Sequence, residues 1–97
     1  MAELNETIHQ PVRLRAMAAL VALEPGQEMD FTTLRGLLGV TDGNLGAHLH
    51  KLEDAGFIAV NKLFVERKPR TYVSVTSLGR KIFAEHVAAL ESILKSK

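Results

Sequence analysis

The chain has 97 residues, 46% of them apolar, which suits one small domain with its own core and is too apolar for a disordered chain. It has no cysteine, which excludes disulfides and thiolate metal sites and fits the reducing environment of the cytoplasm. Its net charge is only +1, but residues 62–81 hold six basic residues and one acid, whereas residues 24–54 hold six acids and two bases. This separation indicates an anionic partner that meets one side of the molecule, although a solvated surface of mixed charge has the same pattern.

No stretch of the sequence predicts a contact with a membrane. The longest apolar run, residues 16–23, is far too short to cross a bilayer, and the first residues lack the basic and then apolar pattern of a signal peptide. We therefore expect a cytoplasmic protein without a membrane partner.

Two helices and a short extended piece are predicted before residue 40. Pro11 suits the first turn of a helix, because its missing N–H would have no partner there, and residues 24–26 end this helix near Leu23. Its apolar face consists of Val12, Leu14, Met17, Leu20, Val21 and Leu23. Residues 29–31 suffice for only a short extended piece. A second helix is capped by Asp30 or Thr32, ends at Gly39, and turns three leucines inward: Leu34, Leu37 and Leu38.

Residues 41–56 form the helix that the other elements support. Thr41 is a favoured N-cap, Gly56 is a left-handed C-cap, and the apolar stripe consists of Leu45, Leu49 and Leu52. The opposite face is small or hydrogen-bonding, with Asp42, Gly43, Asn44, Ala47, His50 and Lys51. Such a face can lie in the major groove of DNA, although an ordinary amphipathic surface helix has the same pattern. The tight link through residues 39–41 makes a helix-turn-helix, which is more specific than either helix alone.

After Gly56 the apolar period falls to about 2, which predicts a β-hairpin. Strand formers in residues 57–65 and 72–75 flank a charged turn over residues 66–70. Thr76 caps a final helix over residues 77–95.

A helix-turn-helix followed directly by a basic-tipped hairpin resembles a winged-helix domain. The string HLHKLEDAGFI (48–58) resembles the end of the recognition helix and the first wing strand of MarR- and ArsR-type regulators. TYVSVTSLGRKIF (71–83) resembles the strand, threonine cap and helix start of the same group. Residues 12–20 and 30–49 are similar to small one-domain winged-helix transcriptional regulators, with Gly46 as a departure where Ser or Ala is usual.

The resemblance implies an α+β, mainly helical fold: a winged helix-turn-helix with a C-terminal dimerisation helix. Residues 1–97 would form a single DNA-binding domain, with the helix-turn-helix and wing in residues 8–76 and the dimerisation helix in residues 77–95. It implies a regulator of transcription that binds double-stranded DNA at a palindromic operator and represses by occlusion. The runner-up is a winged helix that serves as a protein-interaction module in a larger complex, which would not need a basic wing.

The expected DNA contacts lie on the third helix and the hairpin. Asn44 can pair with adenine through its amide, whereas Thr41 and Lys51 suit phosphate. The basic hairpin residues resemble wing residues that touch phosphate or enter the minor groove. The expected set is Thr41, Asp42, Gly43, Asn44, Ala47, His50, Lys51, Lys62, Arg67, Lys68 and Arg70. His48, beside the leucine stripe, is expected to be a partly buried, hydrogen-bonded structural residue.

The last helix predicts a homodimer. Phe83, Val87, Leu90 and Leu94 recur with a heptad-like spacing, and Ile82, His86 and Ile93 widen this seam into a second apolar strip. A helix in a small domain needs one buried face, so the second strip favours a second copy of the chain. The alternative is that both strips pack within the chain.

Neither catalysis nor a cofactor is predicted. The sequence has no nucleophile elbow, no phosphate-binding loop and no H-E-x-x-H. His48 and His50 are two apart on a helix and face different ways, so they cannot easily chelate one ion. Only Glu85, His86 and Glu91 could join a metal site on the last helix, and we expect none. A small-molecule effector stays open: a pocket could form between the first and last helices, but 97 residues leave little room for one.

Overall fold

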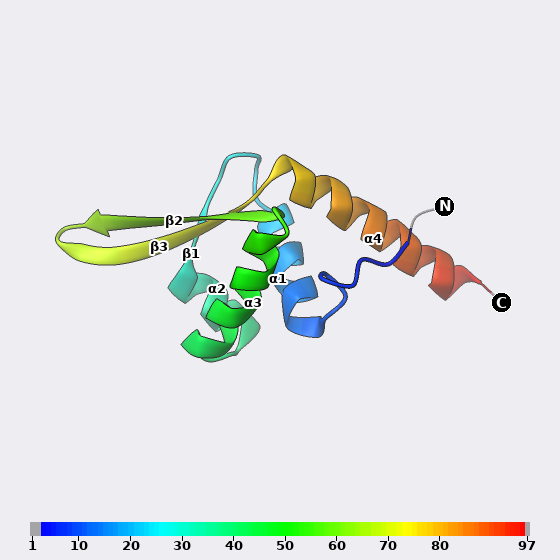
Figure 1. Cartoon of the computed structure of the whole chain (residues 1–97), viewed down its shortest axis with the longest axis horizontal. Coiled ribbons are helices and arrows are strands. Elements are labelled where there is room, and N and C mark those ends of the chain that lie inside the picture. The colour runs from blue at the N-terminus through cyan, green and yellow to red at the C-terminus, as the bar shows by residue number, and fades with distance from the viewer. Residues whose placement is uncertain (1–2, 97) are drawn as a thin grey trace.

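The computed structural model describes residues 3–96 as four helices and a small antiparallel sheet (Figure 1). Residues 1, 2 and 97, at the ends of the predicted domain, lie outside the described residues. The elements are α1 (Pro11–Val21), β1 (Met29–Asp30), α2 (Phe31–Leu38), α3 (Asp42–Asp54), β2 (Ile58–Val65), β3 (Lys68–Val75) and α4 (Ser77–Lys95). The predicted α+β, mainly helical winged helix-turn-helix is confirmed.

α1 is capped at both ends by side chains that lie outside the helix. At its start the Gln10 side chain accepts a hydrogen bond from the Arg13 N–H at 2.9 Å, and Pro11 occupies the first turn. At its end Arg80 of α4 donates to the carbonyls of Val21 (3.1 Å) and Leu23 (2.8 Å). These carbonyls have no partner within the helix, so Arg80 caps α1 and fastens α4 to it.

α2 and α3 form the predicted helix-turn-helix, and local residues fix each end. The Asp30 carboxylate accepts from the Thr32 N–H at 2.7 Å, so Asp30 is the cap of α2. Gly39 ends α2 with a φ of 66°, a left-handed conformation that glycine adopts without strain. The prediction for Leu37 is wrong: its side chain is 59% exposed, because the eight-residue α2 turns only Leu34 and Leu38 into the core.

The sheet has the order β1-β3-β2 and the hairpin projects from the helices (Figure 1). The predicted turn was too long, since β3 begins at Lys68 and only Glu66 and Arg67 connect the strands. Their φ values of 51° and 68° give a type I′ turn, whose twist matches that of the paired strands. Neither residue is a glycine or an asparagine, so the tip of this hairpin is a strained turn.

A corner between the hairpin and α4 explains Gly79. Thr76 caps α4 by accepting from the Gly79 N–H at 2.9 Å, while its hydroxyl donates to the Gly56 carbonyl at 2.6 Å. The Phe57 carbonyl accepts from the Thr76 N–H at 3.0 Å. A Cβ at Gly79 would lie 2.0 Å from this Phe57 oxygen, so only glycine allows α4 to approach so closely.

Residues 3–10, the lead-in before α1, contribute to the core although most of their side chains are polar. Ile8 is fully buried, in one cluster with residues of α1, α2, α3 and the sheet. Arg13 donates from Nε to the Thr7 carbonyl, which holds this segment against α1. The Asn5 N–H donates to Nδ1 of His86 on α4 at 2.9 Å. The segment therefore lies between α1 and α4, and covers part of α4 that the sequence had left for a second copy.

No helix in residues 3–96 combines the length and the apolar character needed to cross a membrane.

Candidate DNA-binding surface

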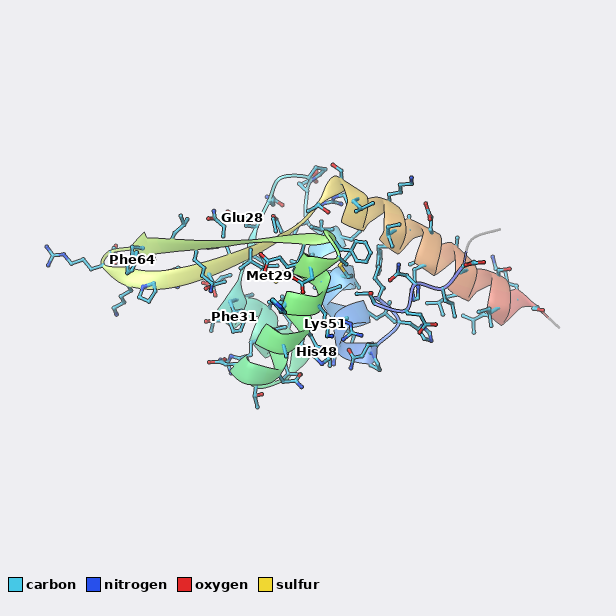
Figure 2. All side chains as sticks on the ribbon, in the orientation of Figure 1. Glu28, Met29, Phe31, His48, Lys51 and Phe64 are labelled. Carbon is cyan, nitrogen blue, oxygen red and sulfur yellow. The ribbon has the colours of Figure 1, made fainter. Side chains whose placement is uncertain are left out.

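The two faces of α3 are those that the sequence predicted. Leu45, Leu49 and Leu52 are buried, and the front carries six exposed residues: Asp42, Gly43, Asn44, Ala47, His50 and Lys51. Figure 2 labels His48 and Lys51, both on this helix. A Cβ at Gly43 or Gly46 would meet no atom within 4 Å, so nothing in the chain covers this surface of α3. Gly46, where similar regulators usually have Ser or Ala, therefore has room for a side chain, and no part of the chain approaches its backbone closely.

Thr41 and Asn44 stand at the start of α3, where free N–H groups and the helix dipole favour an anion. The Thr41 hydroxyl oxygen accepts from the Asn44 N–H at 3.1 Å. Its hydroxyl proton stays available to a phosphate oxygen. The Asn44 side chain is exposed, with its amide free to reach a base edge.

Arg35 is a candidate that the sequence analysis missed. Its Nε lies 2.9 Å from the Asp42 carboxylate, and its side chain is 40% exposed at the junction of α2 and α3. The ion pair offsets the negative charge of Asp42, which would otherwise repel phosphate, and orients a guanidinium beside the recognition helix. A basic residue one turn before Gly39 was the available signal, but only the fold brings it to Asp42.

Two other polar side chains of α3 have partners within the chain. His50 Nε2 lies 3.3 Å from the Asp54 carboxylate one turn later, with both side chains largely exposed. His48 Nδ1 accepts from the Arg13 guanidinium at 3.1 Å, which confirms the prediction of a hydrogen-bonded structural histidine. Desolvation by burial, with the neighbouring Arg13 charge, lowers the pKa of His48 below its ordinary value. The hydrogen bond between Arg13 and His48 therefore joins α1 to α3.

The hairpin presents its basic residues in two different ways. Lys62, Arg67 and Lys68 are exposed along the strands and at the turn. Arg70 differs, because its Nη1 lies 3.3 Å from the Asp30 carboxylate, the cap of α2. Arg70 therefore braces the hairpin against the helix-turn-helix, and part of its charge is already matched within the chain.

A groove of about 400 Å³ separates α3 from the hairpin. Its walls are Gly46, Leu49, His50 and Glu53 of α3, Val60 and Lys62 of β2, and Phe31 and Thr71. Val60, Lys62 and Thr71 are thus on the sheet face that looks toward α3. The recognition helix and this face of the hairpin form the two sides of one concave surface. Residues 3–96 contain no cluster of three potential metal ligands.

The expected dimer residues of α4 divide along the helix. Ile82 and Phe83 are half-buried and pack against the core, and Val87 and Leu90 are also half-buried. The expectation for His86 needs correction: it is fully buried, with Nδ1 bonded to Asn5 and Nε2 3.5 Å from His9 Nδ1. Ile93 and Leu94 are 56% and 81% exposed at the far end. Only this far end of the predicted seam is fully accessible.

A family described as winged helix DNA-binding domain matches residues 12–94. The chain belongs to this family. The match covers the helix-turn-helix, the wing and most of α4, so the surface described above lies wholly within it. The protein is a DNA-binding winged-helix regulator and not an enzyme.

Several known proteins are similar to this chain in sequence or in fold. An uncharacterized protein of Methanocaldococcus jannaschii, MJ0432, is 33% identical over 88% of this chain and 89% of its own. A transcriptional regulator homologue from Pyrococcus horikoshii is 29% identical, with a TM-score of 0.83 over 93% of this chain and 86% of its own. MepR of S. aureus, solved as a DNA complex, is 13% identical with a TM-score of 0.71 over 93% of this chain and 71% of its own. At that identity MepR shows the shared fold alone.

Proposed function

We propose that this winged-helix protein binds a specific double-stranded DNA sequence as a homodimer and represses transcription by occupying a palindromic operator. The observation that carries the proposal is the exposed front of α3 beside an exposed basic wing, with His50 of α3 and Lys62 of β2 on the walls of the groove between them. α3 has the size and side chains for a major groove, and the wing would contact the backbone that flanks it. Residues 1–97 act in this proposal as one DNA-binding domain.

The recognition helix supplies specificity and the wing supplies affinity. Asn44 reads a base edge, and Thr41 with the N–H groups of Asp42 and Gly43 fixes the start of α3 on a phosphate. Lys51, in the last turn of α3, binds a second phosphate further along the backbone. Ala47 is small enough to let the helix lie deep in the groove. Lys62, Arg67 and Lys68 neutralise phosphates beside it. His50 and Arg70 also face the DNA in this proposal, and the charge of each is partly offset by a carboxylate of the chain.

A homodimer through the far end of α4 doubles the number of bases read. Leu94, Ile93 and the exposed sides of Leu90 and Val87 form the contact, with Ile82 and Phe83 at its border. The two recognition helices would enter successive major grooves, roughly 34 Å apart on one side of the duplex. A dimer bound over a promoter shares that DNA with RNA polymerase and excludes it, which is why we expect repression.

Selection of genomic fragments bound by the protein, followed by sequencing, tests sequence specificity. A palindromic motif is the expected result, and enrichment of unrelated fragments would contradict the proposal. Transcription in vitro from a selected fragment then tests the sign of regulation. Less transcript is expected as the protein is added.

The wing is tested by the salt dependence of binding, measured by fluorescence anisotropy. Arg67→Ala with Lys68→Ala removes two phosphate contacts from each subunit and four from the dimer, so the slope of log K against log salt should become shallower by about 3.6. The control is Lys81→Ala with Lys95→Ala, which removes the same charge from exposed positions on α4. Equal changes in both double variants would mean that net charge matters and that the wing makes no contact.

The dimer is tested by Leu94→Glu, which places a charge in the proposed contact at a side chain too exposed to affect folding. Sedimentation equilibrium should give a dimer for the wild type and a monomer of 10.7 kDa for the variant. Leu78→Glu is the control, because Leu78 is an exposed leucine at the other end of the same helix. A monomeric wild type at tens of micromolar would refute the dimer.

A further inference from the structure

The tip of the wing is apolar as well as basic. Leu63, Phe64 and Val65 are 44%, 80% and 39% exposed, and Phe64 is the most exposed aromatic side chain among residues 3–96. Figure 2 shows Phe64 at the tip, far from the core. A phenylalanine gains free energy when it leaves water, and three adjacent exposed apolar residues form the kind of patch that marks a binding surface.

The strand register places Phe64 on the side of the wing that faces the DNA surface. Side chains alternate along β2, so Val60, Lys62 and Phe64 share one face. Val60 and Lys62 line the groove beside α3, and Phe64 follows two residues further out, opposite Pro69. Leu63 points to the other face, opposite Arg70. The same face of the hairpin therefore carries the groove lining near the body and an exposed aromatic ring at the tip.

The charges around Phe64 identify its occupant as DNA. Lys62 precedes it on its own face, and Arg67 and Lys68 follow at the turn, all exposed. An apolar ring with cations beside it suits the minor groove, where two phosphate rows flank the groove and an apolar side chain can insert between stacked base pairs. A second copy of the chain is a poorer occupant, because the proposed dimer contact at Ile93 and Leu94 lies at the far end of α4, opposite the hairpin tip, in a molecule 55 Å long (Figure 1).

The turn geometry adds an independent observation. Glu66 and Arg67 both hold positive φ values without being glycine, a strain that the two-residue hairpin turn imposes and that clusters at functional sites. This tight turn ends β2 immediately after Val65, so Phe64 lies one residue before the end of the strand and close to the tip.

We infer that Phe64 is a minor-groove wedge: it inserts at a base step flanking the site of α3, partly unstacks it and bends the duplex. The inference rests on the proposed DNA binding. Because pyrimidine–purine steps unstack most easily, the protein should prefer TA or CA/TG at that flanking step, although no side chain there reads the bases by hydrogen bonds. Phe64 would then determine specificity through DNA deformability.

The test uses short duplexes with a selected site, each with 2-aminopurine at one flanking position, and a second set with a dye pair at the ends. Wild-type protein should raise the fluorescence at one flanking step and shorten the distance between the dyes. Phe64→Ala should abolish both signals and weaken binding roughly tenfold, with an unchanged salt slope because no cation is lost. Phe64→Leu should restore part of each signal.

Leu63→Ala is the matched control, since it removes an exposed apolar side chain from the other face of the same strand. It should bind within twofold of the wild type and retain both signals. Equal losses for Leu63→Ala and Phe64→Ala would overturn the inference, and so would a wild-type complex without unstacking or bending. In either case binding by the wild type would leave the proposed function standing. A wild type that binds no duplex would instead refute the proposed function.

Discussion

Gly79→Ala adds one methyl group at the most crowded glycine of the chain. The new Cβ would lie 2.0 Å from the Phe57 oxygen and 2.9 Å from the Val75 Cγ2. An ordinary carbon–oxygen contact is about 3.3 Å, so α4 and the start of the hairpin must separate by about 1.3 Å. The Phe57 oxygen also accepts from the Thr76 N–H, so this movement strains the corner that joins the wing to α4.

The expected cost follows from these contacts. Overpacking costs about 1–3 kcal/mol, and weakening two hydrogen bonds of the corner adds about 2 kcal/mol, while the better helix propensity of alanine returns about 1 kcal/mol. We expect Gly79→Ala to lower the free energy of unfolding by about 2–4 kcal/mol, a large part of the stability of a small domain. Urea unfolding followed by circular dichroism measures it.

Gly46→Ala is the matched control. It makes the same substitution within α3, where a Cβ meets no atom within 4 Å, so the helix propensity alone should act and stabilise the protein by about 0.5–1 kcal/mol. A Gly79→Ala protein as stable as the wild type, or a Gly46→Ala protein that loses as much stability as Gly79→Ala, would refute this reasoning.

Three further predictions concern other polar contacts. Burial, with His9 beside it, lowers the pKa of His86 below its ordinary 6.5. As the pH falls, the unfolded chain therefore takes up a proton on this histidine at a higher pH than the folded chain does. The free energy of unfolding should decrease as the pH drops below about 6.5. In urea titrations from about pH 7.5 to about pH 5.5, His86→Asn, which keeps an acceptor for the Asn5 N–H, should flatten this dependence; an unchanged pH profile would contradict it. Asp30→Ala should cost about 1 kcal/mol through loss of the α2 cap, whereas Asp30→Asn should stay close to the wild type in thermal melts. Asn44→Ala should reduce discrimination at one or two base pairs by about 1–3 kcal/mol in competition binding, and an equal loss on all duplexes would assign Asn44 to phosphate.

The sequence determined the elements whose signals are local. Thr41 and Thr76 cap helices, Gly39 and Gly56 leave them with positive φ, and the leucine stripe of α3 is buried as its period predicts. Each of these features depends on residues within about two helical turns of one another, so their spacing alone carries the information. The exposed front of α3 follows from the same period, because a helix that buries one stripe must expose the opposite one.

Only the tertiary structure decided which charged and histidine side chains are already engaged. Arg80 caps α1 from α4, Arg13 joins His48, Arg70 joins Asp30, and the lead-in occupies His86. The partners in these contacts are 35 to 81 residues apart, and no periodic pattern links such positions. A basic residue read from the sequence is equally available to DNA or to a carboxylate of the chain. Whether a carboxylate or carbonyl of the chain lies within hydrogen-bonding distance of it depends on how α1, α4 and the hairpin pack, and only the fold determines that packing.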